Sequence, residues 1–481
     1  MIQIICRSEA YIYNVYHMIK AFYPSEDVVS QVEEKASNYV MVSLPEGQKI
    51  IVGPEVLSES MSEKDKKYLI DTKIYQELTQ LTGQTLAWGI LTGVRPTKIA
   101  MGKLEEGWNK ETFVPWFMDD CKVSCQKAEL AWEIAQREKS LLERLDYKEG
   151  YSLYVGIPFC PSVCTYCSFS SGALEDWKDS VEDYLQALCK ELKFIGKRSA
   201  DKKLNSIYIG GGTPTTLSVA QLERLLSCID ECFSKEYLLE YTVEAGRPDS
   251  INREKLEVIK NHGITRISIN PQSMQQKTLE AIGRKHSVEE IIEAYHMARE
   301  IGFDNINMDI IAGLPGEDME DMQDTLRQIE RLAPDSLTVH SLAIKRAAKM
   351  ELKDLEQDTQ KISRTLSGMI LEASEAAKRM DLVPYYLYRQ KNIAGNFENV
   401  GYAKVDKAGI YNILIMEEKQ SIIAAGAGAS TKIVLPEAIL VPGSKKKKMT
   451  RLIRVENVKA IDAYIERIDE MIERKGEWLW H

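Results

Sequence analysis

Long hydrophobic runs, an excess of basic residues and a secretion signal are all missing from this sequence of 481 residues. A membrane-spanning helix needs about 20 consecutive apolar residues, and no segment approaches that length, so we expect no membrane span. The net charge of −10 argues against a protein that binds nucleic acid or anionic membranes over a broad surface. Because the first residues lack a basic segment followed by an apolar core, we expect a cytoplasmic protein.

The nine cysteines do not indicate a disulfide framework. The cytoplasm keeps thiols reduced, so structural disulfides are not expected there. Three of the cysteines lie together in one short segment and are considered below. The other six are interpreted as buried small hydrophobic residues: Cys6, Cys121, Cys125, Cys189, Cys228 and Cys232.

The apolar fraction of 44% and the charged fraction of 28% are typical of a globular protein, and the length favours two or three domains. Residues 1–150 predict a small α/β domain with a helical linker. Its pattern begins with a strand at 2–6 and a helix at 10–22, followed by a hairpin around 45–47. Further helices are expected at 69–81 and 125–145.

Residues 151–345 alternate short apolar runs with amphipathic helices, six times in succession. Such alternation implies parallel strands with helical crossovers, so the predicted fold class is α/β, with an incomplete (β/α)6 barrel of the TIM type. In such barrels the chemistry lies at the C-terminal ends of the strands. Strands are expected at 153–157, 206–209, 240–244, 266–269, 305–311 and 336–341, with helices at 181–195, 219–232, 253–262, 288–301 and 319–332.

Residues 346–481 show a less regular pattern and are expected to form an irregular C-terminal domain that covers the substrate. Helices are predicted at 359–379 and 458–475. Between them, a glycine-rich segment at 424–430 follows a strand-like run, and its backbone could approach a ligand closely.

Cys160, Cys164 and Cys167 form a CxxxCxxC run directly after the first predicted barrel strand. Three thiolates on one loop can hold three irons of a cubane cluster, which leaves the fourth iron open for a reacting molecule. Zinc is the alternative, but it usually takes four ligands and no second Cys or His pair with suitable spacing is present. The run therefore favours an iron–sulfur cluster.

A CxxxCxxC run after the first strand of a six-fold βα series resembles the radical S-adenosylmethionine (SAM) superfamily. More narrowly, the sequence resembles the oxygen-independent coproporphyrinogen III oxidases and their relatives. The N-terminal domain, with its LTGVRPTK segment, and the YYLYRQ stretch are similar to the HemZ subgroup. The motifs that carry the wider resemblance lie at 154–169, 210–215, 266–273, 283–286 and 309–316.

The resemblance implies a radical SAM barrel in which Cys160, Cys164 and Cys167 bind a [4Fe-4S] cluster that cleaves SAM. Glycines let the backbone approach a ligand, carboxylates suit ribose hydroxyls and an ammonium, and arginine suits a carboxylate. Tyr166 matches a position near a second SAM molecule. The cofactor-binding residues that the resemblance implies are Tyr154, Tyr166, Gly211, Gly212, Thr213, Glu244, Gln272, Arg284, Asp309 and Ala343.

The resemblance also implies a coproporphyrinogen dehydrogenase. Such an enzyme uses a 5′-deoxyadenosyl radical to convert two propionates of coproporphyrinogen III to the vinyl groups of protoporphyrinogen IX. It implies an electron donor of the flavodoxin or ferredoxin type. Because the substrate carries four propionates, we expect cations at the barrel mouth, and the candidates are Arg95, Lys98, Arg389 and the lysines at 445–448.

One departure from the oxidase pattern concerns the residue two positions after the third cysteine. The coproporphyrinogen oxidases proper carry a fourth cysteine there, whereas this sequence has Phe169, as haem-chaperone relatives do. Two alternatives therefore stay open: a haem-binding trafficking protein, and a radical SAM enzyme that acts on haem or another tetrapyrrole.

Overall fold

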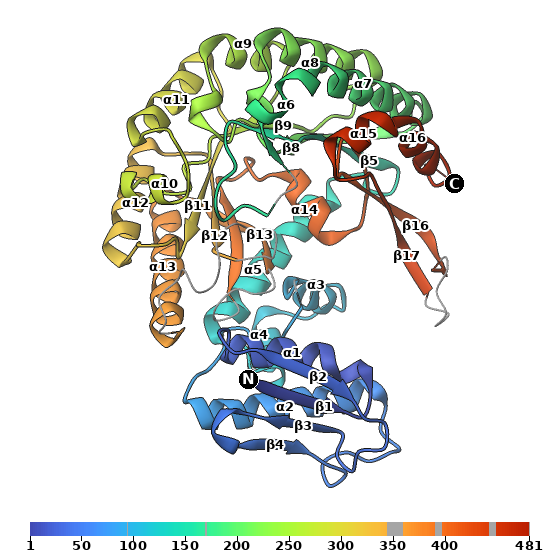
Figure 1. The fold of residues 1–481 in the computed structure, drawn as a ribbon, viewed down its shortest axis with the longest axis vertical. Coiled ribbons are helices and arrows are strands. Elements are labelled where there is room, and N and C mark those ends of the chain that lie inside the picture. The colour runs from blue at the N-terminus through green and yellow to red at the C-terminus, as the bar shows by residue number, and fades with distance from the viewer. Residues whose placement is uncertain (94, 169–170, 344–358, 390–396, 442–448, 481) are drawn as a thin grey trace.

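The computed structural model describes the chain except residues 94, 169–170, 344–358, 390–396, 442–448 and 481. Figure 1 shows a small α/β module at the N-terminus beside a much larger open arch of strands lined on its outside by helices. None of the helices within these described ranges is long and apolar enough to cross a lipid bilayer.

The N-terminal module is a four-stranded sheet with two helices on one face. Along β1 the residues alternate between buried and exposed, as expected for a sheet covered on one side only. The predicted hairpin is confirmed, because β3 and β4 pair antiparallel across a turn at Pro45–Gly47. The sheet order is β2-β1-β3-β4. Its elements are β1 (Ile2–Cys6), α1 (Glu9–Phe22), β2 (Val28–Val32), β3 (Val40–Ser43), β4 (Lys49–Val52) and α2 (Glu63–Thr82).

Three helices connect this module to the barrel: α3 (Thr97–Glu105), α4 (Lys110–Cys121) and α5 (Cys125–Glu143). The longest, α5, packs against α3, α4 and strand β13 (Val383–Arg389). Polar contacts join the linker to the barrel sheet. The indole Nε1 of Trp88 donates to Glu398 at 2.8 Å, and Arg137 donates to the carbonyl of Pro384 at 2.9 Å.

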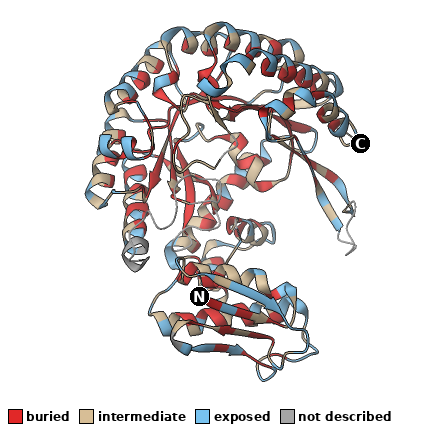
Figure 2. Ribbon diagram, in the orientation of Figure 1, coloured by how far each residue is buried: buried red, intermediate tan, exposed pale blue. Residues whose placement is uncertain are grey.

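Six parallel strands form the barrel, in the order of the chain, and helices cover their outer side. The strands are almost wholly buried, whereas each helix buries one face (Figure 2), which explains why both were predictable from apolar patterning. Capping boxes begin α8, α11 and α12. The (β/α)6 prediction is confirmed by β5 (Gly150–Ile157), α7 (Val181–Arg198), β8 (Lys203–Gly211), α8 (Val219–Cys232), β9 (Glu240–Glu244), α9 (Arg253–Asn261), β10 (Arg266–Ser268), α11 (Val288–Ile301), β11 (Ile306–Ala312), α12 (Met319–Leu332) and β12 (Ser336–Ser341).

The C-terminal part is more regular than the sequence indicated, because its strands extend both edges of the barrel sheet. On one edge, β14 pairs antiparallel with β12, and β13 follows it. On the other edge, β15 runs parallel to β5, and β16 and β17 continue antiparallel. Together they make one sheet of eleven strands. The remaining elements are α13 (Thr359–Arg379), β14 (Glu398–Ala403), α14 (Ile410–Glu417), β15 (Ser421–Ala425), β16 (Ser430–Leu440) and β17 (Met449–Glu456).

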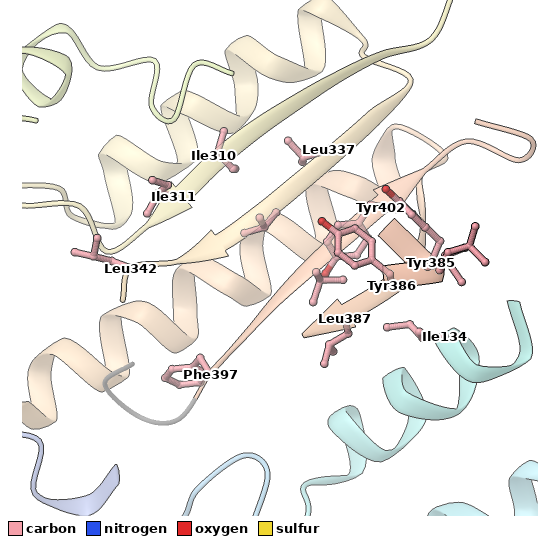
Figure 3. Packing of buried hydrophobic residues seen from close by; sticks show 14 of the residues in the cluster. Ile134, Ile310, Ile311, Leu337, Leu342, Tyr385, Tyr386, Leu387, Phe397 and Tyr402 are labelled. Atoms are coloured by element: carbon pink, nitrogen blue, oxygen red, sulfur yellow. The ribbon is translucent and has the colours of Figure 1, made fainter. Parts of the chain in front are cut away.

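Aromatic packing joins the last barrel strands to this extension. Tyr385, Tyr386 and Tyr402 on β13 and β14 are buried in the same hydrophobic cluster as Ile310 of β11 and Leu337 of β12 (Figure 3), and Leu337 pairs with Tyr402. Ile134 of the linker helix α5 lies against the same region, near Leu387. The core is therefore continuous from the linker into the barrel.

The predicted terminal helix at 458–475 is wrong in one respect: the structure has two helices, α15 (Ile461–Glu466) and α16 (Ile468–Gly476), separated at Arg467. One residue from each helix reaches the fully buried Glu191 of α7. Tyr464 donates to it at 2.6 Å, and Lys475 forms an ion pair with it. Asn457 and the backbone N–H of Gly426 also donate to Glu191, both at 2.9 Å. The change of direction thus brings both side chains to one carboxylate.

Candidate active site

A cavity of about 740 Å³ lies at the C-terminal ends of the barrel strands. Small-molecule sites commonly occupy this volume range, and this is the end of such barrels where chemistry occurs. All thirteen residues that the sequence indicated line it: Tyr154, Cys160, Cys164, Tyr166, Cys167, Gly211, Gly212, Thr213, Glu244, Gln272, Arg284, Asp309 and Ala343.

The cysteine loop follows β5 and carries its three thiols along one side of the cavity. Cys164 is buried, and Cys160 and Cys167 are partly exposed to the cavity. Arg247 donates to the sulfur of Cys164 at 3.6 Å, and Thr213 donates to that of Cys160 at 3.5 Å. Such donors stabilise thiolates, which are the form that binds metal. Arg247 is itself fixed by a bidentate pair with Asp249, at 2.9 and 2.7 Å.

Within the described ranges, no three His, Cys, Asp or Glu side chains are arranged as ligands of one metal ion. Thiolates around a cubane cluster each bind a different iron, so they border the cluster instead of converging on a point. The loop and its polar donors suit such a cluster.

The glycine segment after β8 forms the cavity wall beside the cysteine loop. Gly212 N–H donates to the Ile157 carbonyl and Thr213 N–H to that of Phe159, both at 2.7 Å. Gly211 has a φ of +108°, and a Cβ on Gly212 would lie 2.6 Å from the Phe159 carbonyl oxygen. Only glycine is tolerated at this approach, so the strand end stays open to a ligand.

Arg284 is buried at the cysteine side of the cavity. Its Nη1 donates to the carbonyl of Asn270 at 2.6 Å, and its guanidinium also contacts Tyr166 and Cys164. Among the described residues its Nε has no hydrogen-bond partner. A buried donor without a partner is costly, and a ligand carboxylate could satisfy it.

Gln272 lies beyond the end of β10, and Asp309 lies within the neighbouring strand β11. The backbone of Gln272 has a φ of +67°. Two hydrogen bonds of 2.9 Å hold it in this conformation: its N–H donates to the Asp309 carbonyl, and the N–H of Ile311 donates to the Gln272 carbonyl. A non-glycine residue in this conformation is often found at binding sites. Burial works against ionisation of Asp309, but hydrogen bonds from His340 and Asn307 outweigh it and lower its pKa. Asp309 is therefore an anion that faces the cavity.

Glu244 ends β9 next to three tyrosines. Tyr208 donates a hydrogen bond to it, and the rings of Tyr208 and Tyr411 stack with centroids 4.5 Å apart. Tyr154, which pairs with Tyr208 across β5 and β8, stacks beside them. Burial, together with the charge of Asp309, raises the pKa of Glu244 to about 7. The carboxyl therefore lies in a site that favours a cationic group nearby.

We expect Glu244→Gln to stabilise the cofactor-free protein above about pH 7. The folded carboxyl holds its proton up to about pH 7, whereas the unfolded one releases it near 4.5, so stability falls as pH rises between these values. Glutamine removes that penalty, which is about 1–3 kcal/mol at high pH. Urea unfolding at about pH 5 and about pH 8 measures it. A difference between variant and parent that is equal at both pH values would contradict the assignment.

Several cavity residues were not selected from the sequence as site residues. Tyr208, Arg247 and Tyr411 line the cavity, as does His340, which lies 3.6 Å from Asp309. The sequence did carry a signal for Tyr208. It lies on β8 directly opposite Tyr154 of β5, so both side chains are on the inward face of the sheet. Lys432 of β16, which also lines the cavity, had no comparable signal.

Three of the predicted propionate-binding cations, Arg95, Lys98 and Arg389, do not line this cavity. Arg389 is buried under the linker and donates to the Leu91 carbonyl at 2.8 Å. Arg95 binds Glu418 at 2.7 Å, and Lys98 is exposed on α3. Both arginines therefore join the linker to the C-terminal part. Phe169 and the lysines at 445–448 lie outside the described residues.

The barrel and its cysteine loop define the class. Residues 154–329 match the model of the radical SAM superfamily, so this is a radical SAM protein, and its cofactors are a [4Fe-4S] cluster and SAM. The loop, the glycine strand end and the unsatisfied Arg284 Nε fit these two groups.

Sequence similarity to known proteins identifies the family within this superfamily. The chain is 38% identical over 470 residues to the "oxygen-independent coproporphyrinogen-III oxidase-like protein HemZ" of Bacillus subtilis (strain 168), covering 95% of this chain and 91% of that one. It is 36% identical over 194 residues to the "heme chaperone HemW" of the same organism, covering 40% and 50%. The chain belongs to the oxygen-independent coproporphyrinogen III oxidase family.

A solved structure agrees with the fold. The coproporphyrinogen III oxidase HemN from Escherichia coli, described as a radical SAM enzyme, superimposes with a TM-score of 0.53. The sequence identity is 22%, and the match covers 69% of this chain and 73% of that one.

Proposed function

We propose that the protein is a coproporphyrinogen III dehydrogenase that converts two propionates to vinyl groups and releases protoporphyrinogen IX. The observation that carries this proposal is the single cavity in which the cysteine loop, the strand ends and the C-terminal elements meet. The 38% identity to an oxidase-like protein over nearly the whole chain supports the same reaction class.

In this proposal Cys160, Cys164 and Cys167 hold the cluster. When the cluster and SAM are bound and one electron arrives from a small flavin or iron–sulfur protein, they supply a 5′-deoxyadenosyl radical. The chain's own residues bind and orient the reactants, and the chemistry belongs to the cofactors.

Each cavity residue is assigned a role in SAM binding according to the functional group that it offers. Gly211, Gly212 and Thr213 offer backbone to the methionine end, and Arg284 offers its free donor to the carboxylate. Glu244 and Asp309 accept from ammonium and ribose hydroxyl groups. The remaining proposed contacts are Tyr154, Tyr166, Gln272 and Ala343, with Tyr166 next to a second SAM.

In this proposal water is excluded by the stacked rings of Tyr154, Tyr208 and Tyr411, which line the cavity. On the opposite strands, His340 bridges Asp309 and Tyr388, at 3.6 and 3.3 Å. Holding the substrate carbon in one place matters here, because a small misplacement costs a large factor in rate.

A haem-binding trafficking protein is the second candidate. The observations that favour it are the match to the haem chaperone HemW and the phenylalanine at position 169, where the oxidases proper carry cysteine. Such a protein would keep the same cluster and barrel.

We expect cluster-reconstituted protein, given SAM, a reductant and coproporphyrinogen III without oxygen, to form protoporphyrinogen. Chromatography of the oxidised pigments measures it as protoporphyrin IX, and methionine release is followed in parallel. A second reaction contains haem in place of the porphyrinogen. Stoichiometric haem binding without any protoporphyrinogen would reject the dehydrogenase and favour trafficking, whereas consumption of haem would point to a haem-modifying enzyme.

A further inference from the structure

The cavity has a second end, away from the cysteine loop, that the cofactor roles do not use. It is lined by Ile415 and Met416 of α14, Ile422 of β15 and Lys432 of β16. Lys432 pairs with Ile422, which pairs with Ser152 of β5. Ile157 is the residue at which β5 reaches the cysteine loop, and Ser152 lies five residues before it. The two ends of the cavity are therefore roughly 15 Å apart along this strand.

Four cations line the cavity within the described residues, and three of them have other roles. Arg247 is held by Asp249 at the cysteine loop, and Arg284 is fixed on the Asn270 carbonyl. Arg266 is fully buried in the sheet, where it donates to Ser336 at 3.0 Å. Lys432 is the fourth, and it is the one placed at the remote end.

The surroundings of Lys432 carry an excess of positive charge. Its Nζ lies 3.4 Å from the Ile415 carbonyl and 3.7 Å from Glu418. Glu418 is already paired with Arg95 at 2.7 Å and Arg454 at 3.2 Å. One carboxylate therefore faces three cations, and neither of the Lys432 contacts has the short distance of a strong charge-assisted bond.

Two further carboxyls interact electrostatically with Arg95, one on the linker helix α5 and the other on α14. Glu138 of α5 and Glu417 of α14 are both buried, and burial raises the pKa of each carboxyl. Burial therefore opposes a negative charge on either carboxyl. The side chain of Lys432 is 20% exposed, so it remains within reach of a ligand in the cavity.

We propose that Lys432, in the field of Arg95 and Arg454, binds a carboxylate of the substrate at the end of the cavity remote from the cysteine loop. This rests on the proposed function and names its anion subsite. A large ligand with carboxylates at its periphery is anchored there by one of them, while another part of it reaches the cysteine side. Glu418 acts as the counter-ion that the incoming carboxylate displaces from Lys432.

The test uses anaerobic holoprotein and coproporphyrin III, the stable oxidised form of the substrate, with affinity measured by fluorescence titration. Lys432→Met is expected to weaken binding about 10–100-fold, the value of one charge-assisted contact. Lys432→Arg should restore most of the affinity. The control is Lys98→Met, which removes an exposed charge that does not line the cavity. SAM affinity should be the same in all variants.

A second variant keeps the inference testable if Lys432→Met folds poorly. Glu418→Gln removes the competing carboxylate and is expected to tighten coproporphyrin binding several-fold. Unchanged affinity in both Lys432→Met and Glu418→Gln, with normal binding by the parent, would overturn the subsite. A parent protein that binds neither coproporphyrin nor haem would overturn the proposed function instead, so the two failures are distinguishable.

Discussion

Replacing Cys160, Cys164 and Cys167 together by alanine is expected to reduce bound iron from about four atoms per chain to none. These thiols are the cysteines that line the cavity, and Arg247 and Thr213 donate to two of them. Without thiolates the cluster has no ligands, so the brown absorbance and all SAM cleavage should disappear. Iron and sulfide analysis after anaerobic reconstitution, with electron spin resonance of the reduced protein, measures the change.

A matched triple variant controls for the loss of thiols as such. Cys125, Cys189 and Cys232 lie on helices outside the cavity, and replacing all three by alanine should leave the iron content at the parent level. Circular dichroism should be the same for both triple variants. Equal iron in the parent and in the variant of the CxxxCxxC run would refute the cluster site.

Lys475→Met is expected to lower the free energy of unfolding by about 3–5 kcal/mol. Lys475 and Glu191 are both fully buried, and Lys475 also donates to the Ala424 carbonyl at 2.5 Å. Methionine preserves the packing volume but leaves the Glu191 charge with neutral donors only, and an uncompensated buried charge is costly. Urea unfolding of the variant and the parent measures the loss.

The double variant Glu191→Gln with Lys475→Met tests whether the uncompensated charge of Glu191 causes this loss of stability. It removes both charges, so it should recover most of the stability lost in the single variant. Lys190→Met is the control on the adjacent position, because its pair with Asp469 is exposed and should contribute less than about 1 kcal/mol. A single variant as stable as the parent would contradict the buried-pair account.

The barrel could be predicted from the sequence because its strands and helices are encoded by short-range patterns of apolar residues. A strand that is buried on both faces appears in the sequence as a continuous apolar run. In a helix with one buried face, apolar residues recur every three to four positions. The bounds of β9 and α12 were therefore predicted correctly from the sequence. The cysteines follow β5, Gly211 ends β8 and Asp309 lies within β11, and parallel strands bring their C-terminal halves to one side of the sheet. Residues far apart in sequence could therefore be assigned to one site.

The rest depended on contacts that no local pattern encodes. Lys432 reaches the cavity because β15 returns to pair with β5, a pairing of segments about 270 residues apart. For the same reason Arg95 and Arg389 were misread: their partners, Glu418 and the Leu91 carbonyl, lie on segments distant in sequence. A basic residue of an acidic chain looks equally available in sequence whether it faces a ligand or a buried carboxylate.

The return of β15 to β5 also sets the order in which this protein can assemble. β5 pairs on one side with β8, which follows it closely, and on its other edge with Ser421–Ala425 of β15. On the ribosome, the first barrel strand and its cysteine loop emerge long before that partner exists. Pairings of such long range are slow to form, because the closure of a long loop must precede any gain from contacts. An interval therefore follows in which the cysteine loop has been synthesised while the neighbouring edge of β5 is still unpaired.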